Sequence, residues 1–208
     1  MSSVVHLRPS SFRVMPWKNG LGTTTELLIR PPDATLDNFC FRVSIADLKA
    51  SGPFSRFDEI DRVIVQLEGA PMTLSHEGGA ERVLGLLAPY TFAGELATEC
   101  TLSGASARDF NVMVRRTLAS AKVEVFSLRR DETVFVANEA DTCLVYTQRG
   151  AILVQSGEQK FLVLANEAAL AEGKGRISLR GDEPENIAIV VFIASQGSAG
   201  HAQNPPQT

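Results

Sequence analysis

The sequence is poor in the residues that build metal and redox sites. It contains three cysteines, Cys40, Cys100 and Cys143, and no CxxC pair. An odd number of widely spaced cysteines predicts reduced, buried thiols rather than a disulfide framework. The three histidines, His6, His76 and His201, lie far apart in the sequence. A metal site needs several ligands close together, and each of these regions offers one histidine. We therefore expect no metal, and we interpret His76, beside Gly78, as a surface turn residue.

Long apolar runs and excess positive charge are also missing. The longest late apolar run covers residues 187–194, far too few to span a bilayer. The first residues, MSSVVHLRPSSF, lack the apolar region of a signal peptide. The net charge of −4 argues against nucleic acid as the main partner, because phosphate binding needs a basic face. These features predict a cytoplasmic protein that binds neither nucleic acid nor membrane.

Catalytic and cofactor motifs are absent as well. No GxSxG, GxGxxG or Walker pattern occurs, so no nucleophile or nucleotide cofactor is indicated. Paired carboxylates such as Asp58-Glu59 read most simply as solvated loop charge. We assign no catalytic residue and no cofactor from these patterns.

What the sequence does contain is a series of short β-type runs. From residue 62 onward they recur about every eight to twelve residues between turn glycines, which is typical of a sandwich or barrel. Residues 39–45 also alternate apolar and polar side chains with period two, as a half-buried strand does. The expected later strands are 63–68, 72–75, 82–87, 98–102, 110–116, 122–128, 133–138, 143–147, 151–155, 160–164, 176–180 and 187–193. We see no long amphipathic helix and predict an all-β fold.

A faint internal repeat divides the chain. VIVQLEGAPMTLS (63–75) is similar to LVYTQRGAILVQS (144–156), so Gly69 matches Gly150, and FNVMVRR (110–116) falls where IAIVVFI (187–193) falls. A unit of about 80 residues that occurs twice predicts two stacked jelly-roll β-sandwich halves, over residues 1–120 and 121–194. Residues 195–208 have almost no apolar side chains and are expected to be a disordered tail. Polar residues concentrate in the first half, where we expect any site.

The segment MPWKNGLGTTTE (15–26) holds the sole tryptophan, Trp17, followed by Lys18 and the turn pair Asn19-Gly20. The glycines leave backbone N–H groups unshielded, and such groups next to Lys18 could form an anion-binding concavity. On chemistry alone the simpler alternative is a hairpin turn with Trp17 capping a core.

Three blocks together make the chain similar to the HutD/Ves family. MPWKNGLGTTTE resembles the family's PWKNGGGTT-E signature, and FRVSIADLKASGPFSRFDEIDR and LSGASARDFNVMVRR resemble its second and third blocks. The resemblance covers roughly residues 4–194. It implies a bicupin fold, a cytoplasmic protein without a cupin metal site, and a regulator or metabolite binder associated with histidine utilisation. Leu21 and Asp58-Glu59 depart from the family pattern, which puts the ligand in question.

We therefore hypothesise that the chain is a binding protein for a small carboxylate metabolite. Arginine side chains in the first half would bind the carboxylate group. The resemblance suggests urocanate, formylglutamate or formate. The predicted ligand-binding residues are Trp17, Lys18, Asn19, Gly20, Arg42, Ser44, Phe54, Arg62, Asp109, Asn111 and Arg115. Strand register decides whether Arg42 and Arg115 point into one pocket, so the sequence leaves this open. Alternatives are a non-metal cupin isomerase or hydrolase that uses Asp109 and Lys18, and a protein-interaction module; a homodimer also stays open.

Overall fold

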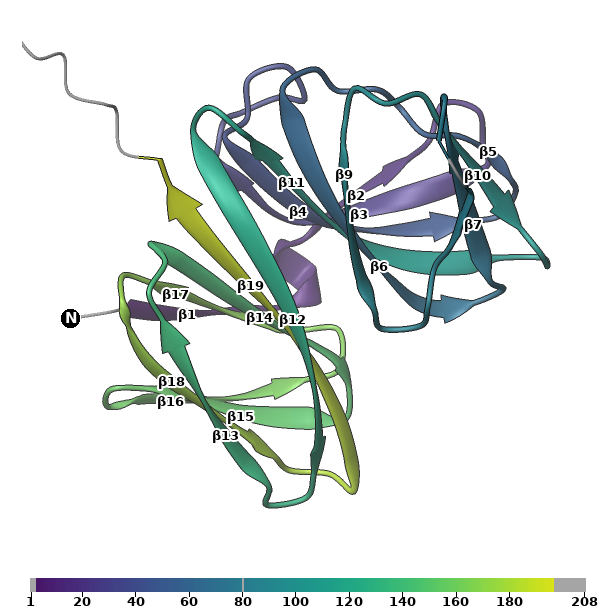
Figure 1. Cartoon of the computed structure of the whole chain (residues 1–208). Coiled ribbons are helices and arrows are strands. Elements are labelled where there is room, and N and C mark those ends of the chain that lie inside the picture. The colour runs from purple at the N-terminus through teal and green to yellow at the C-terminus, as the bar shows by residue number, and fades with distance from the viewer. Residues whose placement is uncertain (1–2, 80, 197–208) are drawn as a thin grey trace, which may run out of the picture.

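The computed structural model describes residues 3–79 and 81–196, and within them the chain is all-β, as predicted. Short strands pair into four sheets, and the one helical turn described is a 3-10 turn at Pro9–Ser11. Two sheets form an N-terminal half and two form a C-terminal half (Figure 1). This arrangement fits the predicted stack of two halves. No helix in the described residues is both long and apolar enough to cross a membrane.

The N-terminal half pairs a six-stranded sheet, ordered β2-β3-β4-β11-β6-β9, with a four-stranded sheet, ordered β5-β10-β7-β8. Its strands are β2 (Arg13–Pro16), β3 (Gly22–Arg30), β4 (Phe41–Leu48), β5 (Gly52–Pro53), β6 (Ile60–Gly69), β7 (Met72–His76), β8 (Glu81–Val83), β9 (Pro89–Ala93), β10 (Thr98–Leu102) and β11 (Ala107–Arg115). The strand expected over 82–87 is shorter and ends at Val83, and sequence reasoning missed β9.

The C-terminal half pairs a five-stranded sheet, ordered β1-β17-β14-β19-β12, with a four-stranded sheet, ordered β13-β18-β15-β16. Its strands are β1 (Ser3–Leu7), β12 (Ala119–Arg129), β13 (Thr133–Asn138), β14 (Thr142–Arg149), β15 (Ala151–Ser156), β16 (Gln159–Leu164), β17 (Ala168–Glu172), β18 (Gly175–Gly181) and β19 (Glu185–Ser195). The expected tail therefore begins inside β19, and residues 197–208 of it lie outside the described residues.

The first strand of the chain belongs to the second half. β1 runs antiparallel to β17, with Val5 opposite Leu170. Residues 3–7 therefore complete the sheet of the C-terminal half, although the predicted boundary groups them with the N-terminal half. The boundary after residue 120 also falls inside β12, a strand of the C-terminal half.

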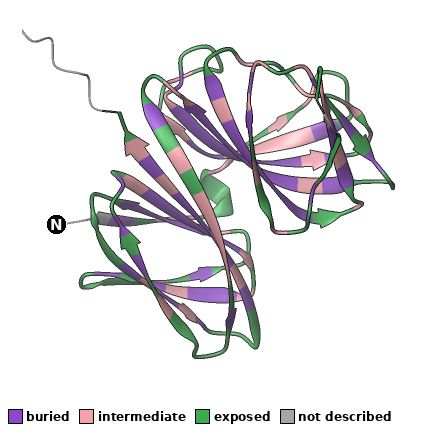
Figure 2. Ribbon diagram, in the orientation of Figure 1, coloured by how far each residue is buried: buried purple, intermediate pink, exposed green. Residues whose placement is uncertain are grey.

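The two larger sheets pack against each other and form a shared apolar core. One face of β4 and β11 contributes Val43 and Val112, and β19 contributes Ile189 and Val191. The rings of Phe110 and Tyr146 lie 5.4 Å apart between their centroids. Figure 2 shows this buried band running through the central strands of both halves. Because alternate residues of a strand face opposite sides, the other face of β4, β6 and β11 lines the interior of the N-terminal sandwich.

Candidate functional site

Five of the predicted ligand-binding residues meet on the interior face of the N-terminal sandwich. In the sheet register, Met113 lies between Arg42 and Arg62, and Asn111 lies between Ser44 and Ile64. Asp109 follows one row further, between Ala46 and Gln66. The five residues are Arg42, Ser44, Arg62, Asp109 and Asn111, and none is more than 7% exposed. Residues 109, 111 and 113 share one face of β11, and this face points into the sandwich.

Arg62 is the central cation of this interior. Its guanidinium lies 5.0 Å from the ring centroid of Phe54 and 4.9 Å from that of Phe92, so aromatic rings contact it. Nη2 donates to Asn111 Oδ1 at 2.9 Å, Nη1 donates to the Ser55 carbonyl at 3.5 Å, and the buried Nε has no partner. Burial lowers the pKa of Arg62 to about 10, against the opposing attraction of Asp109. The side chain therefore stays charged at neutral pH with only neutral hydrogen-bond partners.

Asp109 is the buried carboxyl group beside it. The side-chain amide of Asn111 donates to Asp109 Oδ1, whereas the buried Oδ2 has no partner. Burial raises the pKa of Asp109 to about 7, although the Arg62 charge and the Asn111 hydrogen bond favour the ionised form. At neutral pH the group is thus divided between a carboxylate and a neutral acid that can donate a hydrogen bond.

The second interior arginine is paired. Arg42 Nε donates to Glu26 Oε2 at 2.6 Å, and both side chains are at most 10% exposed. Glu26 lies on β3 directly opposite Ser44, so three adjacent strands contribute to this part of the interior. The pair is close to neutral, which leaves Arg62 as the interior cation whose charge Asp109 only partly offsets.

The expectation that His76 is a surface turn residue is wrong. His76 ends strand β7, and its Nδ1 lies 2.8 Å from Thr98 Oγ1 and its Nε2 3.0 Å from the Tyr90 hydroxyl. Its ring also stands 5.1 Å from the ring of Phe92. It is therefore a half-buried strand residue whose pKa burial lowers, not a surface turn residue. Within the described residues, no three His, Cys, Asp or Glu side chains are grouped to hold a metal ion.

The glycine-containing turn satisfies its own hydrogen bonds. Gly20 N–H donates to the Trp17 carbonyl at 3.0 Å, and the Leu21 N–H donates to Asn19 Oδ1 at 3.0 Å. Lys18, Asn19 and Gly20 are exposed on this turn. The Gly20 amide is thus used inside the turn and is not free for an anion, and the hairpin-turn interpretation describes this part of the backbone.

Trp17 nevertheless contributes to the wall of the interior. Its indole N–H donates to Thr24 Oγ1 at 2.8 Å, and its ring packs on the cluster that also contacts Phe54. A Cβ at Gly22 would lie 2.9 Å from two ring carbons of Trp17 and 2.5 Å from the Asp47 carbonyl oxygen. The second glycine of the signature therefore lets the Trp17 ring approach the backbone of β3 closely.

Arg115 lies apart from the five predicted ligand-binding residues that meet in the interior. It ends β11 and donates to the carbonyl groups of Phe39 and Asp37, at 3.3 and 3.0 Å, and it forms an exposed ion pair with Glu59. These contacts anchor the 37–39 segment at the end of the strand. Arg42 and Arg115 accordingly do not share one site.

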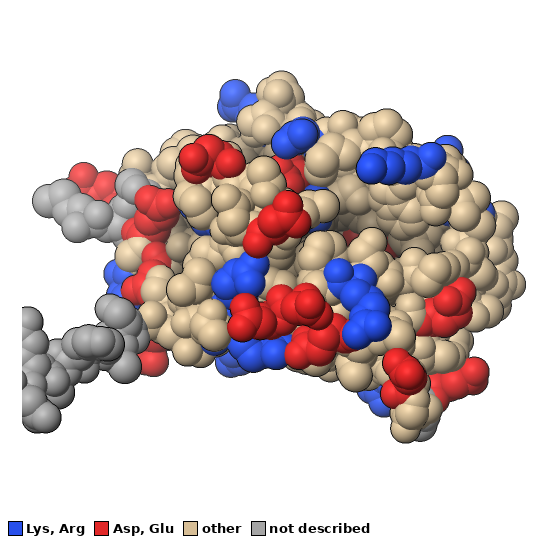
Figure 3. All heavy atoms as spheres, turned by 90° about the horizontal axis from the view of Figure 1, so that it is seen from above, with Lys and Arg blue, Asp and Glu red and all other residues tan. Residues whose placement is uncertain are grey.

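The surface above the N-terminal half is hollowed. Figure 3 shows this hollow from above, with Lys, Arg, Asp and Glu side chains around it. Arg42 and Glu26 are the interior pair that retains slight exposure, whereas Asp109 is 1% exposed. The exposed fraction thus decreases from the Arg42–Glu26 ion pair, which is slightly exposed, to the Asp109 carboxyl group, which is fully buried.

The comparisons with known proteins agree over most of the chain. The HutD family model matches residues 9–189. An uncharacterized 21.2 kDa protein in the hutC 3' region of Pseudomonas putida is 36% identical over 146 residues, which are 70% of this chain and 74% of that protein. A conserved protein of unknown function from Pseudomonas aeruginosa PAO1 is 28% identical, with a TM-score of 0.84 over 93% of this chain and 100% of that one. HutD from Pseudomonas fluorescens SBW25, in a structure named for a formate condition, is 28% identical, with a TM-score of 0.78 over 94% and 100%.

Proposed function

The chain belongs to the HutD family, and from this premise we propose that it binds a small carboxylate inside the N-terminal sandwich. The observation that supports this most is Arg62, a buried guanidinium with neutral partners and an unpartnered Nε. Burying a charge that is only partly offset is costly, so an anion that reaches Arg62 gains a strong charge-assisted hydrogen bond. Arginine is also suited to carboxylates because its planar group can donate two parallel hydrogen bonds.

Asp109 and Asn111 extend the recognition of the anion. A protonated Asp109 can donate from Oδ2, the atom that lacks a partner, to a carboxylate oxygen. The raised pKa of Asp109 keeps this neutral form populated near pH 7. Ser44 and Asn111 add neutral polar groups on the two adjacent strands.

The low exposure of these groups favours a very small ligand. Arg62, Asp109 and Asn111 are 7%, 1% and 6% exposed, so a bulky molecule would have to displace side chains. Of formate, urocanate and formylglutamate, we therefore place formate first. The formate condition named for the Pseudomonas fluorescens HutD is consistent with this order, and the hutC neighbourhood of the Pseudomonas putida relative supports a role as a metabolite-sensing regulator of histidine utilisation.

The test is isothermal titration calorimetry with formate, followed by urocanate and formylglutamate, on the unmodified protein and on Arg62→Gln. We expect saturable formate binding that Arg62→Gln weakens at least tenfold, because loss of a charged hydrogen bond costs about 1.5–3 kcal/mol. Arg149→Gln is the matched control, since it removes an exposed arginine of the C-terminal half and should leave binding unchanged. No heat and no thermal stabilisation with any of the three carboxylates would contradict the proposal.

A second candidate is a metal-free isomerase or hydrolase acting on a small carboxylate. Asp109 favours it, because a carboxyl group with a pKa near 7 is suited to general acid–base catalysis. The expected partner Lys18 lies exposed on its turn, and Asp109 is joined to Asn111 instead. Turnover of a candidate carboxylate that disappears in Asp109→Asn would favour the enzyme; binding without turnover would favour the binding protein.

A further inference from the structure

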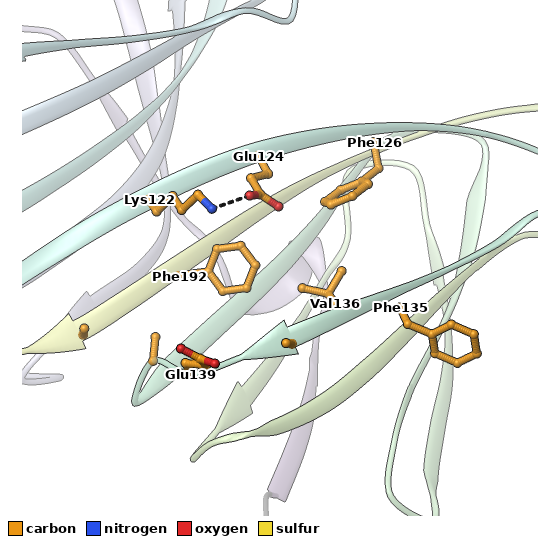
Figure 4. Close-up of a pocket in the computed structure, with 10 residues that line it drawn as sticks. Lys122, Glu124, Phe126, Phe135, Val136, Glu139 and Phe192 are labelled. Atoms are coloured by element: carbon orange, nitrogen blue, oxygen red, sulfur yellow. Dashed lines mark ion pairs between the residues drawn. The ribbon is translucent and has the colours of Figure 1, made fainter.

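A second cleft opens in the C-terminal half, away from the site described above. It has a volume of about 500 Å³, within the range of small-molecule pockets. It lies between β12 and β19 of the larger sheet and β13 of the smaller sheet, where Figure 4 shows Phe192 and Val136 facing the space between the strands. The lining residues are Lys122, Glu124, Phe126, Phe135, Val136, Ala137, Glu139, Ala140, Phe192 and Ala194.

The open side of the cleft follows from the sheet order. β12 is the edge strand of the five-stranded sheet and β13 is the edge strand of the four-stranded sheet. The two edges diverge, so the interior of the sandwich is accessible between them. Phe126 and Phe192 are only partly buried for this reason, although they pack against the core of this half.

The sheet order and register place this cleft at the position equivalent to the N-terminal site, two residues away from the sequence match of 110–116 with 187–193. β14, β19 and β12 are neighbours in the same order as β6, β11 and β4. In that register Phe192 lies between Lys122 and Cys143, as Met113 lies between Arg42 and Arg62. The offset from Arg62 to Cys143 is the 81 residues that separate Gly69 from Gly150.

The two equivalent interiors differ in chemistry. The buried cation Arg62 is replaced by Cys143, a thiol that is 1% exposed, and Asn111 is replaced by Val190. The core behind the C-terminal cleft is therefore apolar at these positions and offers no buried charge for a carboxylate. A ligand must instead be held by its apolar surface against Phe126, Phe192 and Val136.

The charges of the cleft lie at its rim. Lys122 Nζ and Glu124 Oε1 are 2.6 Å apart, and their side chains are 72% and 35% exposed. Glu139 lies across the cleft, at the end of β13, as Figure 4 shows. Among the lining residues, Lys122 is paired with Glu124, which leaves the Glu139 carboxylate without a counter-charge and favours a cationic group on the ligand beside it. The nearby Arg176 stacks on the ring of Phe135, 3.8 Å from its centroid.

We propose that this cleft is a second ligand site, which binds a small molecule with an aromatic body and a positively charged amino group. The aromatic body packs on Phe126 and Phe192, and the ammonium group faces Glu139 at the rim. This site is independent of the carboxylate proposed for the N-terminal half, because none of its lining residues belongs to that half.

The test uses 2-phenylethylamine as the probe and 3-phenylpropionate as its anionic counterpart, measured by two-dimensional NMR titration of the whole chain. We expect saturable shifts at Val136, Phe192 and Ala194 with the amine, and weaker binding of the anion. Glu139→Lys should raise the dissociation constant of the amine at least threefold, because it reverses an exposed charge at the rim. Ala194→Trp should abolish binding by filling the cleft, with an unchanged NMR spectrum elsewhere to show that the fold is intact.

Arg62→Gln is the control, and it should leave amine binding unchanged while it weakens formate binding at least tenfold. Absence of saturable amine binding to the unmodified protein would overturn the proposal. So would amine binding that neither Glu139→Lys nor Ala194→Trp alters, or tighter binding of 3-phenylpropionate than of the amine as measured by the shifts of the cleft residues Val136, Phe192 and Ala194.

Discussion

Replacing Asp109 by asparagine should stabilise the protein at alkaline pH. The change keeps the size of the side chain and its carbonyl-type acceptor for Asn111, but it removes the charge that burial disfavours. In the unmodified protein the folded state retains a proton on Asp109 that the unfolded chain has already released between about pH 4 and pH 7. The free energy of unfolding therefore falls as the pH rises through this range and levels off above pH 7.

The magnitude follows from the pKa. A rise from 3.8 to about 7 corresponds to about 4 kcal/mol, because each pKa unit is worth about 1.4 kcal/mol. Between pH 5 and pH 8 the titration of Asp109 should lower the free energy of unfolding by about 3 kcal/mol. Relaxation of the buried site reduces this effect, so the value is an upper estimate. Asparagine at position 109 does not titrate in this range. From pH 5 to pH 8 the free energy of unfolding of Asp109→Asn should therefore rise, relative to that of the unmodified protein, by up to about 3 kcal/mol.

Urea unfolding at pH 5 and pH 8 measures this difference directly. Glu183→Gln, which removes an exposed carboxylate from an ion pair with Arg130, is the control and should behave as the unmodified protein does. If Asp109→Asn and the unmodified protein differ in stability by the same amount at both pH values, Asp109 is not a buried acid with a raised pKa.

The other predictions concern the ligand and two structural positions, Gly22 and Asn186. Formate should bind about tenfold more weakly at pH 8 than at pH 6, because ionised Asp109 repels it, and calorimetry on Asp109→Asn should show no such dependence. Gly22→Ala should cost about 2 kcal/mol and shift the fluorescence of Trp17, whose ring the new Cβ would meet; an unchanged spectrum and unfolding curve would count against this packing. Asn186→Ala should cost about 3 kcal/mol in urea unfolding, because the buried Ala151 N–H loses its acceptor, and a cost below about 0.5 kcal/mol would mean that this amide is not needed.

The fold was largely predictable because its signals are local or repeated. Period-two alternation over residues 39–45 identifies β4, and the match of Gly69 with Gly150 predicts two similar halves, which the arrangement of the four sheets fits. β1 was assigned to the wrong half because its partner, β17, lies more than 150 residues along the chain. No local pattern reports such a pairing, and an apolar edge strand of five residues fits either half equally well.

The site was predictable to the extent that it follows from strand geometry. Residues 109, 111 and 113 share a face because side chains alternate, and the family-like blocks marked Arg42, Arg62 and Asn111. The sequence could not show that Arg115, on the same face, is held by the carbonyl groups of the 37–39 segment. The sequence also could not show that the Gly20 N–H donates to the Trp17 carbonyl inside its own turn. The contacts of Arg115 and of Gly20 both depend on which backbone groups come within hydrogen-bond distance.

The division between a polar and an apolar interior has a physical basis in the shared core. β4 and β11 bury Val43 and Val112 against the C-terminal half on one face, while the opposite face carries Arg42 and Asn111. Buried polar groups contribute little net stability, so a sandwich with such an interior needs apolar burial elsewhere. The C-terminal half supplies it through Ile189 and the other residues of the shared core. The apolar core that the second half shares with the first therefore stabilises the sheet whose opposite face carries these buried polar groups.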